Sequence, residues 1–134
     1  MLRMTASGAP RLPRVAVVED DADSALLASA SLASHFEVMT YTSGETALAA
    51  FTEYTPAAVV LDIGMRTGMD GVQVLRTMRE IPALASIPAL ALTAYASASM
   101  RERFLSMGFD AYVAKPLQAP EQLLHAVQEM LARR

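Results

Sequence analysis

Cysteine is absent from the sequence, and this absence excludes disulfides, thiolate catalysis and cysteine-based metal sites. No apolar run approaches the roughly 20 residues of a membrane-spanning helix, so we expect no membrane partner. The first 14 residues lack the apolar core of a signal peptide, which favours a cytoplasmic location. The net charge of −3 provides no general attraction to nucleic acid backbones, so no direct nucleic-acid partner is expected.

Lysine is nearly absent as well. Ten of the eleven basic residues are arginine, and the remaining one is Lys115. A lysine ammonium is a compact point charge, whereas an arginine guanidinium is a planar fork. A single lysine in such a chain therefore indicates a position that needs the point charge.

The residues that are present indicate one folded domain. The 134 residues are 53% hydrophobic and 19% charged, which is enough for a sizeable core and argues against disorder. Residues 1–13 mix Gly, Ser, Pro and Arg without periodicity, and we interpret them as a flexible N-terminal arm. Residues 14–134 form the predicted domain.

Short apolar runs alternate with helical patterns throughout this domain, giving five strand–helix units. The expected strands are 15–18, 37–41, 57–61, 87–92 and 111–114, and the expected later helices are 44–54, 72–79, 99–107 and 120–131. Apolar strands joined by helices predict a parallel α/β sheet that is covered on both faces. Five units form an open, doubly wound sheet, in which functional residues gather beyond the carboxyl ends of the strands.

The first helix follows the first strand directly. We expect Asp23 or Ser24 to cap it, because their side chains can accept hydrogen bonds from exposed backbone amides. Its leucines, Leu26, Leu27 and Leu32, are predicted to form the inner face.

Four strand ends carry polar side chains of a particular kind. Glu19 and Asp20 follow the first strand, Asp62 the third, Thr93 the fourth and Lys115 the fifth. Each one alone would ordinarily be a helix cap, a turn residue or a solvated charge. Together they predict an acidic pocket with one ammonium and one hydroxyl at a single edge of the sheet.

Such a pocket suits Mg²⁺, a hard cation that takes carboxylates, waters and phosphate oxygens as ligands. A carboxylate beside the ion can attack phosphorus and become an aspartyl phosphate. Lys115 can neutralise charge on the phosphoryl oxygens, and Thr93 can donate a hydrogen bond to one of them.

At this point the sequence resembles the receiver domains of two-component response regulators. The matching segments are VAVVEDD at the first strand, VVLDIGM and MDG around the third, ALTAYA at the fourth and AYVAKPL at the fifth. The resemblance covers about residues 14–134, and its specificity lies in the order and spacing of the segments. It implies a flavodoxin-like five-stranded sheet of order 2-1-3-4-5 with five helices.

The resemblance also implies the roles of individual residues. Asp62 would be the phosphoacceptor and, with Asp20, a ligand to Mg²⁺ or Mn²⁺. Glu19 would contact the ion through water, and Gly64 would offer its backbone carbonyl.

The remaining roles concern the response to phosphorylation. Lys115 would bind the phosphoryl group, and a cis peptide bond would join it to Pro116. Thr93 and Tyr112 would be the switch residues that report phosphorylation.

The function implied is that of a signalling domain rather than a turnover enzyme. It would take its phosphoryl group from a histidine kinase or a histidine phosphotransfer protein, and it can lose the group by autodephosphorylation. Phosphorylation would then change the face made by the fourth helix, fifth strand and fifth helix. That face would bind a downstream protein of unknown identity or a second copy of the chain.

One segment departs from the family pattern, which commonly has a Met-Pro pair three residues after the phosphoacceptor. Here DIGMRTGMDG has no proline, carries Arg66, and is one residue longer. Losing the fixed φ of proline loosens the loop. We interpret the Arg66 side chain as solvated rather than as a phosphate ligand.

Two alternatives remain open. The altered loop is compatible with a receiver-like domain that binds partners without phosphorylation. A phosphatase of the haloacid-dehalogenase type also forms an aspartyl phosphate, but it needs a second Asp two residues after the nucleophile. Gly64 occupies that place, which argues against steady turnover.

Overall fold

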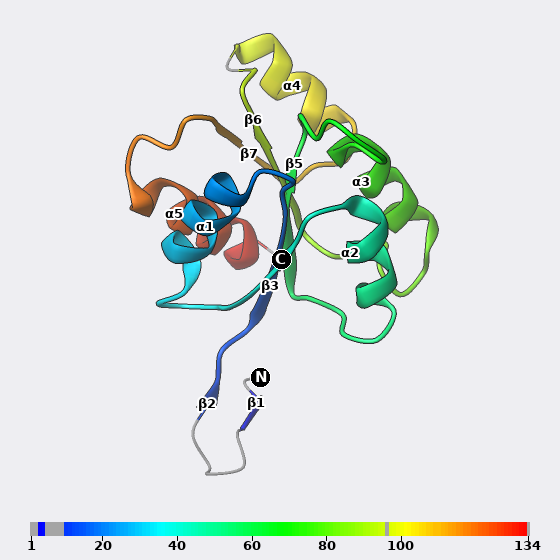
Figure 1. Cartoon of the computed structure of the whole chain (residues 1–134), viewed down its shortest axis with the longest axis vertical. Coiled ribbons are helices and arrows are strands. Elements are labelled where there is room, and N and C mark those ends of the chain that lie inside the picture. The colour runs from blue at the N-terminus through cyan, green and yellow to red at the C-terminus, as the bar shows by residue number, and fades with distance from the viewer. Residues whose placement is uncertain (1–2, 5–9, 96, 134) are drawn as a thin grey trace.

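Five parallel strands form the centre of the structure, a computed structural model that describes residues 3–4, 10–95 and 97–133 (Figure 1). The strands of this sheet are β3 (Arg14–Val18), β4 (Glu37–Tyr41), β5 (Ala58–Asp62), β6 (Ala89–Thr93) and β7 (Ala111–Ala114). The helices are α1 (Ala22–Leu32), α2 (Gly44–Phe51), α3 (Gly71–Glu80), α4 (Ala98–Ser106) and α5 (Pro120–Ala132). In space the strands lie in the order β4-β3-β5-β6-β7. The predicted fold class and the order 2-1-3-4-5 are therefore confirmed.

The helices cover the two faces of the sheet and close two separate cores. Alternate side chains of β3 and β5 point to opposite faces, as in any strand. One core contains buried residues of α2, α3 and α4, and the other contains buried residues of α1 and α5. Because both faces are covered, every residue of the central strand β5 is buried. This double burial explains why the strands are apolar throughout rather than alternating.

The first helix corrects one prediction. Leu32 is fully buried, but Leu26 and Leu27 are 70% and 48% exposed. A helix turns about 100° per residue, so the face that carries Leu32 also carries Ala28 and not the other two leucines. The cap also differs from the expectation of Asp23 or Ser24, because the Asp21 carboxylate accepts the amide of Ser24 at 2.8 Å.

Some element bounds also differ from the predicted ranges. The fourth strand begins at Ala89 rather than at 87, because the Ile87 amide donates to Leu84 in the preceding turn. The second helix ends at Phe51, short of the predicted 54.

The N-terminal segment contains a two-residue ladder in which β1 (Arg3–Met4) pairs antiparallel with β2 (Pro10–Arg11). It lies below the sheet in Figure 1, away from the helices. The rest of the predicted arm, residues 1–2 and 5–9, lies outside the described residues. Among the residues that the structure describes, no helix combines the length and apolar character required to span a membrane.

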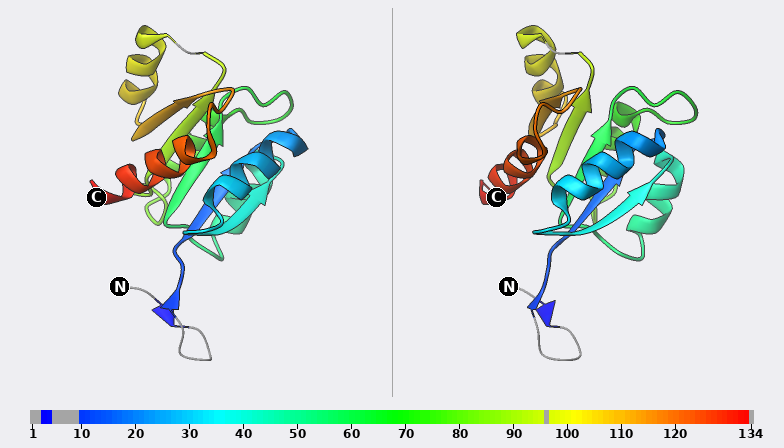
Figure 2. Two further views of the ribbon diagram at one scale, coloured as in Figure 1. Left: turned by 90° about the vertical axis from the view of Figure 1, so that its left-hand side faces the viewer. Right: turned by 60° about the vertical axis from the view of Figure 1, so that its left-hand side comes forward.

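All five strands of the main sheet run in the same direction, so their carboxyl ends meet at one edge (Figure 2). The segments that leave these ends come from widely separated parts of the chain. The fold therefore gathers the polar residues predicted to act together.

Candidate functional site

The register of the sheet places the predicted site residues side by side. Val18 pairs with Leu61, so the residues that follow them, Glu19 and Asp62, are neighbours at the edge. Thr93 ends β6, next to β5, and pairs with Ala114 of β7. Lys115 follows Ala114 directly. The strand ends thus bring the predicted constellation together.

Three carboxylates form the acidic part of the site. One oxygen from each of Glu19, Asp20 and Asp62 lies within 4.8 Å of the others. Glu19 is 2% exposed and Asp62 is 4% exposed, whereas Asp20 is half-buried. Carboxylates at this spacing repel one another, and a divalent cation relieves that repulsion. The donor set consists of hard oxygen ligands and fits Mg²⁺ or Mn²⁺.

Lys115 bridges two of these carboxylates. Its Nζ lies 2.7 Å from Glu19 Oε2 and 3.1 Å from Asp62 Oδ1. The peptide bond from Lys115 to Pro116 is cis, as expected from the resemblance. The single lysine of the chain is therefore aimed at the carboxylate predicted to accept the phosphoryl group.

Burial and neighbouring charges shift the pKa values of Glu19 and Lys115. Burial raises the pKa of Glu19 above 4.5, and the neighbouring Asp62 raises it further, although the hydrogen bond from Lys115 opposes both effects. Burial alone would lower the pKa of Lys115, but its contacts with Glu19 and Asp62 prevail and raise it above 10.5. The ammonium is thus held in its charged form.

Two backbone amides hold the rim of the site. The Gly64 amide donates to Asp62 Oδ1 at 3.1 Å, and the Arg66 amide donates to Asp20 Oδ2 at 2.9 Å. The first contact joins residues two apart, whereas the second joins segments 46 residues apart in the sequence. The Arg66 contact was not predicted, because its donor is the backbone amide and not the side chain. The missing proline was the signal that a backbone donor was available there.

Asp21, which directly follows the acidic pair, makes two local hydrogen bonds. Its amide donates to Glu19 Oε1 at 3.1 Å while its carboxylate caps α1. The hydrogen bonds from Ser24 are the main cause that lowers the pKa of Asp21 below 3.8. The α1 N-terminus is thereby fixed next to the acidic cluster.

Thr93 and Tyr112 are connected through the backbone of Tyr95. Thr93 is 1% exposed, and its Oγ1 accepts the Tyr95 amide at 3.1 Å. The Tyr112 hydroxyl donates to the Tyr95 carbonyl, and its ring stacks on Phe104 with centroids 6.0 Å apart. Thr93 faces the acidic site, whereas Tyr112 lies outside it.

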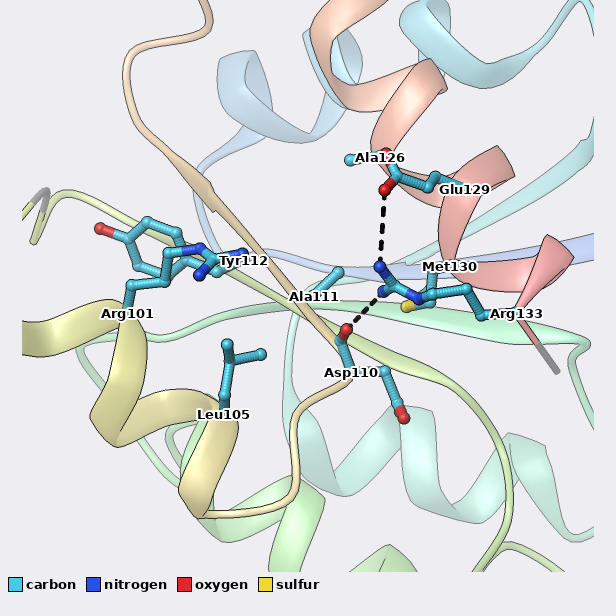
Figure 3. Close-up of a pocket in the computed structure, with 9 residues that line it drawn as sticks. All are labelled: Arg101, Leu105, Asp110, Ala111, Tyr112, Ala126, Glu129, Met130 and Arg133. Atoms are coloured by element: carbon cyan, nitrogen blue, oxygen red, sulfur yellow. Dashed lines mark hydrogen bonds and ion pairs between the residues drawn. The ribbon is translucent and has the colours of Figure 1, made fainter. Parts of the chain in front are cut away.

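All the predicted site residues except Tyr112 and Pro116 line one cleft, and Pro116 lines a neighbouring pocket with Lys115. The walls of the cleft are formed by Glu19, Asp20, Asp21, Ser24, Asp62, Gly64, Arg66, Thr93, Ala94, Tyr95 and Lys115. Tyr112 instead belongs to a second hollow between α4, β7 and α5 (Figure 3). Among the residues that the structure describes, none lines both the cleft and the second hollow, and the Tyr95 backbone connects the two through its hydrogen bonds to Thr93 and Tyr112.

The second hollow carries charges of both signs. Arg133 contacts Glu129 at 3.5 Å and donates to the Asp110 carbonyl at 2.8 Å, as Figure 3 shows. Arg101 of α4 lines the same hollow. A change in the position of Tyr112 would therefore alter the shape of this hollow and the arrangement of the charged side chains around it.

Comparison with known proteins agrees with this geometry. Residues 15–128 match the family model of the response regulator receiver domain. The chain is 38% identical over 123 residues to the phosphate regulon transcriptional regulatory protein PhoB of Rhizobium meliloti, covering 91% of this chain and 53% of that protein. It is 40% identical over 125 residues to the transcriptional regulatory protein PrrA of Mycobacterium tuberculosis, covering 91% and 51%.

A solved structure shows the same architecture. The chemotaxis response regulator CheY4 of Vibrio cholerae superposes with a TM-score of 0.81 at 25% identity, covering 89% of this chain and 98% of that one. PhoB and PrrA are longer, and the chain spans about half of their length.

Proposed function

The chain belongs to the response regulator receiver domain family, and on that premise we propose that it accepts a phosphoryl group on Asp62 and changes its binding surface in response. The phosphodonor is a histidine kinase or a histidine phosphotransfer protein in the cytoplasm. The observation that carries the proposal is the position of Asp62, which belongs to the acidic cluster and lies 3.1 Å from the Lys115 ammonium.

The chemistry is a phosphoryl transfer between two side chains. An oxygen of the Asp62 carboxylate forms the new bond to phosphorus while the bond to the donor's imidazole nitrogen breaks. The electron pair of that bond remains on the imidazole. Lys115 neutralises charge on the phosphoryl oxygens, and the Thr93 hydroxyl donates a hydrogen bond to one of them.

The acidic cluster would hold the cation that this chemistry needs. Asp20 and Asp62 would be direct ligands of Mg²⁺ or Mn²⁺, with the Gly64 carbonyl as a third, and Glu19 would contact the ion through water. When bound, the ion supplies positive charge that offsets the negative charge of the phosphoryl group. One oxygen of each of the three carboxylates lies within 4.8 Å of the others, which supports this assignment.

The response to phosphorylation passes through Tyr95. A phosphoryl group on Asp62 attracts the Thr93 hydroxyl, which at present accepts the Tyr95 amide. Because the Tyr95 carbonyl accepts the Tyr112 hydroxyl, movement of Thr93 changes the position of Tyr112. The equilibrium between two arrangements of the α4–β7–α5 face then shifts. Its partner is a downstream protein or a second copy of the chain.

Intact-mass spectrometry after incubation with acetyl phosphate and Mg²⁺ tests the proposal. We expect the wild-type chain to gain the mass of one phosphoryl group, and Asp62→Asn to gain none while keeping its far-ultraviolet circular dichroism spectrum. Asparagine matches aspartate in size but lacks the carboxylate nucleophile.

The same experiment decides the alternative. If the wild type remains unmodified with acetyl phosphate and with a phosphohistidine donor, the chain is a phosphorylation-independent interaction domain. The altered loop of residues 65–70 is the feature that favours this second function. Under either proposed function, the chain acts as a binding domain and not as a turnover enzyme.

A further inference from the structure

The hydrogen bond from the Arg66 amide to Asp20 Oδ2 is a contact between the loop after β5 and the acidic pair after β3. At 2.9 Å it has the length of a good N–H to carboxylate bond. Asp20 is the least buried of the three clustered carboxylates, so its orientation depends on contacts of this kind.

The contact exists only because residue 66 is not proline. Proline has no backbone N–H and could not donate to Asp20. The sequence at this point reads Met65-Arg66, where the pattern of similar chains has Met-Pro. The absence of proline at position 66 therefore has two effects: it loosens the loop, and it supplies a backbone hydrogen-bond donor.

The rest of the loop is anchored so that this amide is presented to Asp20. Met65 is 8% exposed and packs in the core, and the Met69 amide donates to Glu45 Oε1 at 3.2 Å. Between them Gly68 has φ +68°, and a Cβ there would lie 2.5 Å from Glu45 Oε2. The positive φ is a backbone conformation that glycine adopts without strain and other residues rarely adopt.

We propose that the Arg66 backbone amide is a positioning group for the metal ligand Asp20. It holds one carboxylate oxygen so that the other is directed to the cation shared with Glu19 and Asp62. The inference rests on the proposed function of the same site and adds to it a donor outside the set of ligands. The Arg66 side chain has no part in the positioning.

Two substitutions separate the amide from the side chain. Arg66→Ala and Arg66→Pro both remove the guanidinium, but only Arg66→Pro removes the N–H. A role of the guanidinium would change Mg²⁺ affinity in both variants equally. Since the guanidinium has the same sign as the cation, its removal alone leaves the affinity unchanged or makes it tighter.

Isothermal titration calorimetry of the full chain with Mg²⁺ measures the difference. We expect Arg66→Pro to bind Mg²⁺ roughly tenfold more weakly than Arg66→Ala, the lower end of the loss seen when partners of metal ligands are removed. Equal dissociation constants in the two variants would overturn the inference. If the wild type itself binds no Mg²⁺, the proposed function fails and the inference fails with it.

A second measurement does not depend on the folding of the proline variant. Amide hydrogen exchange of Arg66, followed by NMR in the cation-free wild type, reports the hydrogen bond directly. In Asp20→Ala this exchange should become faster, while exchange of the Gly64 amide, bonded to Asp62, stays close to its wild-type rate. An Arg66 amide that exchanges at the same rate in both proteins would show that the bond is absent in solution.

Discussion

Glu19 is a carboxylate in a place where a carboxylate is costly. It is 2% exposed, and the Lys115 ammonium 2.7 Å away is the cation that compensates its charge. Asp62 lies close enough to oppose ionisation further. The net effect is a raised pKa, which means that the folded chain binds a proton at Glu19 more tightly than the unfolded chain does.

This raised pKa predicts a pH dependence of stability. Below about pH 4.5, the ordinary value, both states are protonated and Glu19 contributes its full stability. As the pH rises from there through the folded-state pKa, the unfolded chain releases the proton first and the folded state loses stability. A glutamine side chain cannot titrate, so Glu19→Gln should gain stability relative to wild type over this range.

Urea unfolding without divalent cations, at pH 4.5 and at neutral pH, measures the difference between the two chains. The stability advantage of Glu19→Gln over the wild type should grow toward neutral pH. A difference that is constant, or that turns in favour of the wild type, would show that Lys115 fully compensates the carboxylate.

Most of the site could be predicted at the scale of single residues, because the carboxyl ends of parallel strands must meet. Glu19, Asp62, Thr93 and Lys115 each end a recognisable apolar run, and the structure brings all four together. The Arg66 contact could not be predicted in this way. Its donor is a backbone amide, and every residue but proline has one, so only the folded loop shows where it points.

Helix α1 was predicted at the right place in the sequence, but the prediction of which side faces the core was wrong. Its inner face consists of Ala28, Ser31 and Leu32, two of them small residues, and it packs on α5. The sequence prediction followed the largest apolar side chains, and two of these point outward. Small residues let two helices approach closely, but they give a weak hydrophobic pattern, so the sequence alone favours the leucines.

A pair of alanine substitutions tests this orientation. Leu32→Ala removes a fully buried side chain and should lower the free energy of unfolding by about 2–5 kcal/mol. Leu26→Ala, on the same helix and 70% exposed, should change it by less than about 0.5 kcal/mol. Urea unfolding at neutral pH measures both. Similar losses in the two variants would mean that α1 is rotated from the position described.

At the scale of the whole molecule, the alternation of apolar runs and helical patterns predicted an open, doubly wound parallel sheet, and the family resemblance supplied the strand order. Parallel strands require crossovers, and right-handed crossovers leave few arrangements for five units. The two cores on opposite faces of the sheet follow from that topology. The connection between the acidic cleft and the α4–β7–α5 face could not be predicted from the sequence. It depends on the backbone of Tyr95, whose amide donates to Thr93 and whose carbonyl accepts the Tyr112 hydroxyl.

That connection predicts where the molecule responds to phosphorylation. In ¹H–¹⁵N spectra recorded before and after treatment with acetyl phosphate and Mg²⁺, shifts should occur around Asp62 and also across α4, β7 and α5. Amides of the opposite edge, in β4 and α2, should move least. Shifts confined to the acidic cleft would contradict a switch that passes through Tyr95 and Tyr112.

The central claim is that Asp62, and no other residue, carries the phosphoryl group. Borohydride reduces an aspartyl phosphate to homoserine, so reduction of the phosphorylated chain followed by tandem mass spectrometry of its peptides locates the modified residue. We predict homoserine at position 62 in the Mg²⁺-treated wild type, and none when Mg²⁺ is withheld. Homoserine at another aspartate, with position 62 unchanged, would contradict the account.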